Sequence, residues 1–295
     1  MRAGQASRTA QYAAAFRAVE TIRRPARARL FDDPYAIHFL PPGLRRVVRA
    51  AGLPVLGPVV LAYVDRRWPG AMTSGIARTR WIDDRLLAAA RDGVAQVVLL
   101  GAGFDCRAHR LPALARCRIV EVDHPATQAM KRERLARLLA GTPDRVTYVA
   151  ADLTREDLRS VLATAGLDRA ARTFVLWEGV THYLGGAAVD ATLRAVAATI
   201  ASGSRLLFTY LHRGVLDGTV AFDGAAFSKD RVAGDGEPWI WGMDPARLPA
   251  YLAERGLDHL EDVGADEYRT RYWGERGRRM RGFGFYRAAL AEVRR

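Results

Sequence analysis

The chain has 295 residues, of which 49% are hydrophobic and 26% are charged, and its formal net charge is +13. This balance is typical of a folded globular protein and excludes a largely disordered chain. Two cysteines are too few for a disulfide framework or a four-cysteine zinc site. The basic residues are nearly all arginines, spread along the chain without an aromatic-basic recognition module, so we expect no nucleic-acid partner.

The longest apolar segment, "GLPVLGPVVLAYV", has 13 residues and carries two prolines. A helix that crosses a bilayer needs about 20 apolar residues, so we expect no membrane span. The first 16 residues, "MRAGQASRTAQYAAAF", have no continuous apolar stretch and do not indicate a secretory signal. With so few cysteines, we expect a cytoplasmic protein.

The first quarter of the chain predicts helices. Apolar residues at helical spacing indicate a helix over residues 7–24, and three prolines interrupt the chain soon after it. A less regular apolar region follows at 44–69. We therefore predict that residues 1–76 form a helical cap that covers the substrate, and that residues 77–295 form the main domain.

A helix is predicted over residues 79–91, and strands and helices are predicted to alternate after it. Six short apolar segments are predicted as strands: 97–100, 118–122, 145–153, 173–180, 204–211 and 281–290. The intervening segments have helical patterns, near 126–139, 155–165, 189–201 and 245–256. Alternating strands and helices predict an α/β domain, with a doubly wound, mostly parallel sheet covered by helices on both faces.

Candidate ligand-binding residues lie at the ends of the first four predicted strands. They are Gly101, Ala102 and Gly103, then Asp123, then Asp152 with Leu153, then Glu178. Ligands of such sheets bind at the carboxyl ends of the strands, and a carboxylate such as Asp123 suits a ribose diol. The dinucleotide fingerprint would place a third glycine at position 106, where this chain has Cys106. A nicotinamide-dependent oxidoreductase is therefore disfavoured, although it stays an alternative.

The motifs "GAGFDCRAHRL", "EVDHP", "ADL" and "EGVTHYL", in this order and spacing, resemble the leucine carboxyl methyltransferase-like family. The resemblance extends upstream to "FRAVET", "LFDDPYA" and "ARTR" and downstream to "GEPWIWGMDP", and it covers roughly residues 7–290. It implies a seven-stranded, Rossmann-like fold of the class I methyltransferases and S-adenosylmethionine (SAM) as cofactor, with S-adenosylhomocysteine as product and no metal. The bacterial branch of the family implies O-methylation of polyketides and other natural products.

The resemblance also implies roles for individual residues. Arg78 would bind the methionine carboxylate of SAM, and Gly101, Ala102 and Gly103 would line the cofactor near that end. Asp123 would hold the ribose, while Asp152 and Leu153 would flank the adenine. A plain alternative is that Asp152 caps the following helix.

Glu178 and Tyr183 would lie beside the methionine part and the substrate, although Glu178 could instead pair with an arginine of the cap. A carboxylate acceptor needs no general base, whereas an alcohol or phenol benefits from one. His182 is the best base candidate because it follows the fourth strand, and its ordinary pKa suits the task. His212 and His124 are weaker candidates, and no histidine pair has metal-ligand spacing.

The segment 213–243 is rich in Gly and Asp and carries Phe222, Phe227, Trp239 and Trp241, which predicts either a lid over the substrate or an anchored surface excursion. Residues 268–281 are strongly basic and could attract an acidic acceptor or a carrier protein. We expect a small-molecule acceptor, acidic or carrier-bound, and leave a homodimer open. The alternative to an O-methyltransferase acting on carboxyl or hydroxyl groups is a SAM-binding scaffold or regulator that does not methylate.

Overall fold

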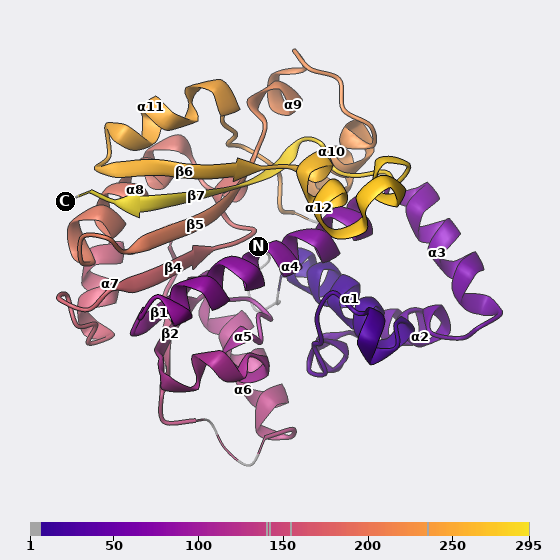
Figure 1. The fold of residues 1–295 in the computed structure, drawn as a ribbon, viewed down its shortest axis with the longest axis horizontal. Coiled ribbons are helices and arrows are strands. Elements are labelled where there is room, and N and C mark those ends of the chain that lie inside the picture. Colours follow the sequence, from indigo (N-terminus) through magenta and orange to yellow (C-terminus); the bar gives the residue numbers. More distant parts are fainter. Residues whose placement is uncertain (1–6, 140, 142, 154, 235, 295) are drawn as a thin grey trace.

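A seven-stranded sheet forms the centre of the molecule (Figure 1). This computed structural model describes residues 7–139, 141, 143–153, 155–234 and 236–294. The strands are β1 Gln96–Leu100, β2 Arg118–Asp123, β3 Val146–Ala150, β4 Thr173–Trp177, β5 Arg205–Leu211, β6 Leu257–Val263 and β7 Tyr286–Val293. Their order is β3-β2-β1-β4-β5-β7-β6, and β7 pairs antiparallel with both β5 and β6. The predicted doubly wound, mostly parallel α/β sheet is confirmed.

Helices cover both faces of the sheet. They are α1 Arg8–Arg23, α2 Pro42–Ala51, α3 Leu56–Arg67, α4 Ala71–Arg91, α5 Arg107–Arg110, α6 Pro125–Ala136, α7 Leu158–Thr164, α8 Gly186–Thr199, α9 Arg213–Asp217, α10 Ala225–Gly234, α11 Leu248–Ala253 and α12 Ala265–Arg278. Along β1, Val98 and Leu100 belong to one hydrophobic cluster, whereas Val97 and Leu99 belong to another. Because successive side chains of a strand point to opposite faces, this alternation places a packed layer on each side.

The predicted elements differ from the observed ones at the starts of α4 and β7 and in two elements that were not predicted. Helix α4 begins at Ala71 instead of residue 79, so it runs through the predicted domain boundary at residue 76. Strand β7 begins at Tyr286. Residues 281–285, which contain two glycines and were predicted as part of the strand, therefore lie before it. Strand β6 and helix α12 were not predicted; β6 reads "LDHLEDV", whose charged residues hide its strand character.

The first three helices form a layer beside the sheet. Ser7 caps α1 by accepting a hydrogen bond from the Ala10 N–H. The ring of Phe39 stacks on that of Phe104, with centroids 4.8 Å apart, and so joins this layer to the segment after β1. Among the described residues, no single helix has the length and apolarity to cross a bilayer; α2 and α3 would pass that test only as a pair, bent by 119°.

Candidate functional site

A cavity of about 1290 Å³ lies between the carboxyl edge of the sheet and the helices α1 to α3. It brings together the residues that the sequence singled out at four separate strand ends and Arg78 of helix α4. These lining residues are Arg78, Gly101, Ala102, Gly103, Asp123, Asp152, Leu153, Glu178, His182 and Tyr183. His124 also lines the cavity, whereas the imidazole of His212 accepts a hydrogen bond from the Gly214 N–H at the start of α9.

The sheet topology explains why these residues meet. From β1 the chain winds outward through β2 to β3, and it then returns to β4 on the other side of β1. The strand order therefore reverses between β1 and β4. In open α/β sheets, ligands bind in the crevice at this switch point. The turn after β1 and Glu178 after β4 flank it.

The turn after β1 depends on its two glycines. Gly101 has φ +64°, and a Cβ added to it would lie 2.3 Å from a methyl carbon of Val180. Gly103 has φ +48°, and its N–H donates to the carboxylate of Asp123 over 2.6 Å. The same carboxylate accepts from the His124 N–H over 2.7 Å. Asp123 thus joins the ends of β1 and β2, and burial raises its pKa despite these two hydrogen bonds.

Asp152 and Leu153 follow β3 at the third strand end. The carboxylate of Asp152 lies 3.6 Å from the guanidinium of Arg155. Helix α7 begins at Leu158, and its cap is Asp157, whose side chain accepts from the Ser160 N–H. Asp157 therefore caps α7, while residue 154, where the alternative placed the helix start, lies outside the described residues; Asp152 lines the cavity.

Glu178 lies between two arginines. Its carboxylate accepts from Nε of Arg78 over 2.8 Å and from Nη1 of Arg107 over 3.0 Å. Burial alone would raise the pKa of Glu178, but the two guanidinium groups outweigh it and hold that pKa below its usual value. Arg78 also lies over the ring of Tyr286, 4.5 Å from its centroid. Glu178 thus pairs with two arginines, but both belong to the main domain and neither to the predicted cap of residues 1–76.

Arg107 is a central residue that the sequence reasoning missed. Besides Glu178 it binds Asp83, with Nε 2.7 Å from a carboxylate oxygen, and it also contacts Asp105. Its side chain is 3% exposed, so three carboxylates share one buried guanidinium. Asp105 lines the cavity, and Arg107 together with other cations lowers its pKa although burial opposes this. Both residues lie in the motif "GAGFDCRAHRL", in which the sequence predicted roles for Gly101, Ala102 and Gly103 alone.

The same ion network continues into the helical layer. Arg110 binds both oxygens of Asp83 over 2.7 Å and lies 3.8 Å from Asp33. Asp33 in turn accepts from Nε of Arg17 on α1 over 2.8 Å. These pairs are almost fully buried, so the floor of the cavity and the first helices are joined by charges that water scarcely reaches.

His182 is buried beside the cavity, at 1% exposed. Its ring lies 4.1 Å from that of Tyr183 and 5.4 Å from that of Tyr286. Burial, and secondarily the charge of Arg78, lowers the pKa of His182 to about 3. The imidazole is therefore neutral near pH 7 and a weak proton acceptor, which does not favour the predicted role as general base.

The depressed pKa of His182 predicts a pH-dependent stability. In the unfolded chain this residue takes up a proton near its ordinary pKa of 6.5, whereas in the folded protein it does so only near 3. Its contribution to stability is therefore present above pH 6.5 and is lost as the pH falls, by up to about 1.4 kcal/mol per pH unit. We expect the unfolding free energy of His182→Gln to fall less steeply below about pH 6. Its slope against pH, measured by urea unfolding, should be smaller by the equivalent of one proton.

His109 provides the comparison for this measurement. Burial lowers its pKa to about 4, so it causes a similar loss and remains in the His182→Gln variant. His109→Gln should remove a comparable slope, and the double variant should remove both. An unchanged slope in a folded His182→Gln protein would contradict the low pKa.

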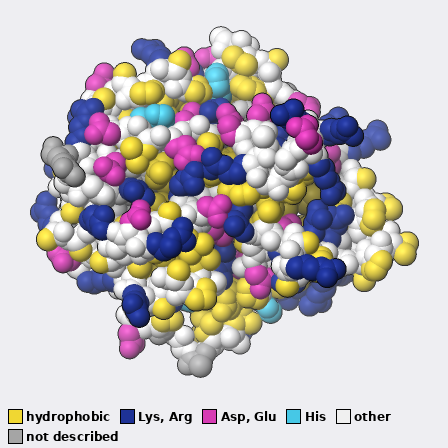
Figure 2. Space-filling view, viewed as in Figure 1, with side chains coloured by type: hydrophobic (Ala, Val, Ile, Leu, Met, Phe, Trp, Pro, Cys, Tyr) yellow, Lys and Arg dark blue, Asp and Glu magenta, His cyan; other side chains and the backbone are white. Residues whose placement is uncertain are grey.

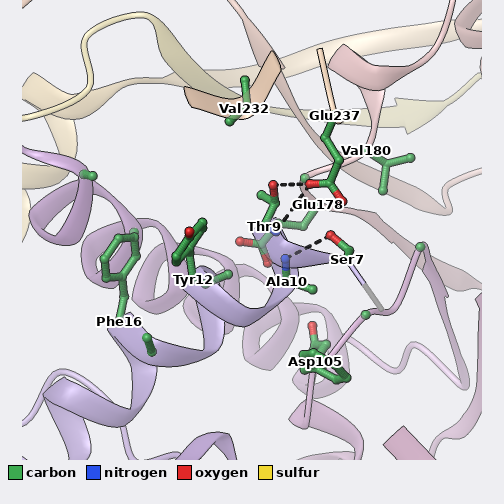
Figure 3. Close-up of a pocket in the computed structure, with 18 of the residues that line it drawn as sticks. Ser7, Thr9, Ala10, Tyr12, Phe16, Asp105, Glu178, Val180, Val232 and Glu237 are labelled. Atoms are coloured by element: carbon green, nitrogen blue, oxygen red, sulfur yellow. Dashed lines mark hydrogen bonds between the residues drawn. The ribbon is translucent and has the colours of Figure 1, made fainter. Parts of the chain in front are cut away.

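Three polar side chains of the cavity lining form a hydrogen-bonded chain. The hydroxyl of Tyr183 donates to that of Thr9 over 3.0 Å, and Thr9 donates both its hydroxyl and, over 3.3 Å, its N–H to Glu237. Figure 3 shows Glu237 pointing toward Thr9 at the start of α1. Residues from the core, the first helix and the predicted lid segment thus meet at one point.

The segment 213–243 contributes directly to the cavity wall. Ser228, Val232, Glu237, Trp239 and Ile240 line it. Trp241, by contrast, packs in the main hydrophobic cluster, and Phe222 packs against Phe285. The side chain of Phe227 lies outside the described part of the chain. The segment is therefore more than a surface excursion, because it closes one side of the cavity.

The family model described as leucine carboxyl methyltransferase matches residues 10–197. A protein of Mycobacterium avium named "putative S-adenosyl-L-methionine-dependent methyltransferase" is 37% identical over 211 residues, 67% of this chain and 62% of that protein, so the match spans less than two thirds of the relative. A protein of the same name from Streptomyces coelicolor is 38% identical over 240 residues, 79% of this chain and 81% of that one.

Among solved structures, a DUF574-family protein from Streptomyces avermitilis superposes with a TM-score of 0.62 at 18% identity, covering 94% of this chain and 96% of that one. At this identity the likeness concerns the fold. The sheet order and the site at its switch point define a Rossmann-like protein with the class I methyltransferase fold. The chain belongs to the leucine carboxyl methyltransferase family.

Proposed function

We propose that this protein is a SAM-dependent O-methyltransferase that acts on a carboxyl or hydroxyl oxygen of a small metabolite of polyketide or natural-product type. The observation that carries the proposal is the single cavity lined by all ten residues predicted for the cofactor and the reaction. Family membership supports it independently. We expect the reaction to take place in the cytoplasm.

The lining residues fit SAM in their chemistry. Gly101 packs against Val180 with no room for a side chain, and the turn at residues 101–103 lines the cavity. The carboxylates of Asp123 and Asp152 are acceptors for a ribose diol and an adenine amino group, and Leu153 offers an apolar contact to the base. Arg78 uses its Nε for Glu178, which leaves other donors of its guanidinium for a carboxylate.

When bound, SAM supplies a methyl group already activated by its attachment to a positively charged sulfur. The protein then has to align the acceptor oxygen and exclude water, and such positioning can lower a barrier by about 7–11 kcal/mol. Glu178, fixed by two arginines, offers a constant negative charge at the cavity. The hydrogen bonds from Thr9 to Glu237 join the first helix to the segment 213–243, and both residues line the cavity.

The properties of His182, the best base candidate, favour a carboxylate acceptor. His182 has a pKa of about 3, and burial raises the pKa of Tyr183, so neither group is suited to take a proton near pH 7. A carboxylate is already deprotonated at that pH and needs no base, whereas an alcohol does. Within the proposed reaction, we therefore favour the formation of a methyl ester.

The first experiment is calorimetric titration of the protein with SAM, S-adenosylhomocysteine and NAD. We expect micromolar binding of the two sulfur-containing ligands and none of NAD. If SAM binds, the protein is incubated with isotopically labelled SAM and with pairs of acceptors, each a carboxylic acid and the corresponding alcohol. We expect the labelled methyl group to be transferred to the acid and not to the alcohol. Binding of NAD alone would refute the proposal, and SAM binding with no transfer to any acceptor in a broad set would favour the scaffold alternative.

A further inference from the structure

The cavity is larger than one small ligand requires. Its volume of about 1290 Å³ exceeds the roughly 300–1,000 Å³ that is typical of pockets for drug-sized ligands. The residues at the strand ends account for one part of it. The remaining part extends away from the sheet, toward the helices α2 and α3 that Figure 1 places at the outer edge of the molecule.

This outer part is lined almost entirely by apolar side chains. Helix α1 contributes Tyr12, Ala13 and Phe16, helix α2 contributes Val48, and helix α3 contributes Val60. Figure 3 shows Tyr12 and Phe16 along α1, one turn apart, at the cavity. The polar groups of the cavity, Asp123 and Glu178 among them, lie at the opposite, sheet end. The cavity is therefore polar at its inner end and apolar along its outer length.

The outer part reaches the protein surface. Val47, Val59 and Tyr63 line the cavity and yet are 44%, 68% and 65% exposed, so they form an apolar rim. Val55, one helical turn before Val59, is 82% exposed and continues the apolar surface beyond the rim. Figure 2 shows this hydrophobic surface along the right edge, where Figure 1 places α3. Neighbouring exposed apolar side chains of this kind mark binding sites on soluble proteins.

We propose that the space between α1, α2 and α3 is a binding channel for an elongated apolar chain, whose oxygen-bearing end lies at the sheet and whose tail extends to the rim of Val47, Val59 and Tyr63. This inference rests on the proposed function, because it assigns the acceptor of that reaction to a class: long-chain amphiphiles ending in a carboxyl group. Arg78 at the inner end suits the anionic carboxyl group, and the outer channel suits the tail. Apolar packing along the channel selects for length.

The test measures binding of a series of linear carboxylic acids, from about six to about fourteen carbons and below their micelle concentrations, by calorimetry without SAM. Burying one methylene contributes about 0.8 kcal/mol, which corresponds to about fourfold in affinity. We therefore expect affinity to rise by up to about fourfold with each added carbon and to level off once the tail reaches the rim. An affinity independent of chain length would overturn the proposal.

Three variants locate the binding site. Ala13→Trp fills the channel from α1, and Val59→Asp places a charge at the rim; each should lower the affinity for the longest acid at least about tenfold. Val55→Asp is the matched control, since it makes the same change at the exposed residue just before α3, outside the cavity lining, and it should bind like the unmodified protein. Unchanged binding in both Ala13→Trp and Val59→Asp would place the chain elsewhere and refute the channel.

Titration of the same proteins with SAM separates the two proposals. SAM should bind all of them with equal affinity, which also shows that the variants are folded. If SAM fails to bind the unmodified protein, the proposed function fails. If SAM binds while the acids show no length dependence, the channel fails and the proposed function stands.

Discussion

Replacing Arg107 by methionine should lower the free energy of unfolding by at least about 3–5 kcal/mol, the usual cost of removing one partner from a buried ion pair. Methionine fills a similar volume without a charge, so Asp83, Asp105 and Glu178 would lose a shared cation that is 3% exposed. The three carboxylates would then have to be neutralised or hydrated. Urea unfolding at several pH values measures the loss.

The pH dependence distinguishes lost charge from lost packing. In the native protein the pKa values of Asp105 and Glu178 are lowered, so their contribution to stability is present above the ordinary pKa of a carboxyl group and is lost as the pH falls. The deficit of the Arg107→Met variant should therefore be larger at neutral pH than near pH 4. A deficit independent of pH would mean that the guanidinium acts mainly by filling space.

An exposed ion pair serves as the control. Arg137 pairs with Glu133 on the surface of α6, with side chains 69% and 60% exposed. Exposed pairs of this kind contribute about 0–1 kcal/mol, so Arg137→Met should leave stability nearly unchanged. Arg107→Lys should restore only part of the loss, because an ammonium lacks the planar fork that binds several carboxylates.

Replacing Asp123 by alanine should weaken SAM binding by about tenfold or more, equivalent to about 1.4 kcal/mol. The carboxylate is the proposed ribose ligand, and it also holds the N–H groups of Gly103 and His124. The variant therefore loses a ligand contact and the link between the ends of β1 and β2 together. Calorimetric titration at a temperature well below unfolding measures the affinity.

Two further variants separate these effects. Asp123→Asn keeps an oxygen acceptor for one backbone N–H, and it should retain more of the turn than alanine while losing the charge. Asp157→Ala removes the exposed cap of α7, outside the cavity lining, and should cost stability without changing SAM affinity. Equal SAM binding by the native protein and a folded Asp123→Ala variant would refute the ribose assignment.

The strands and their ends were predictable because their signals are local. Residues 97–100 form a short apolar run that stops at a glycine, and the structure places β1 there with all five residues buried. The carboxyl ends of parallel strands meet at one edge, so the residues after β1, β2, β3 and β4 had to lie near one another once the topology was known. For this reason the predicted site residues all reach one cavity.

The partners of these side chains were not predictable from the sequence. Arg107 and Glu178 are 71 positions apart, and Thr9 and Glu237 are 228 apart, so no local pattern connects them. The low pKa of His182 likewise depends on burial and on Arg78, which spacing does not reveal. Strand β6 was missed because an edge strand with polar residues lacks the apolar run that marks a buried one.

The position of β7 affects how the chain folds during its synthesis. Strands β5 and β6 are both synthesised before β7, yet each pairs with β7. Until β7 emerges, β5 therefore lacks this partner along one edge, and such an edge attracts other chains. Tyr286, the first residue of β7, also supplies the ring beneath Arg78. The sheet and the cavity are completed together, after the last strand has left the exit tunnel.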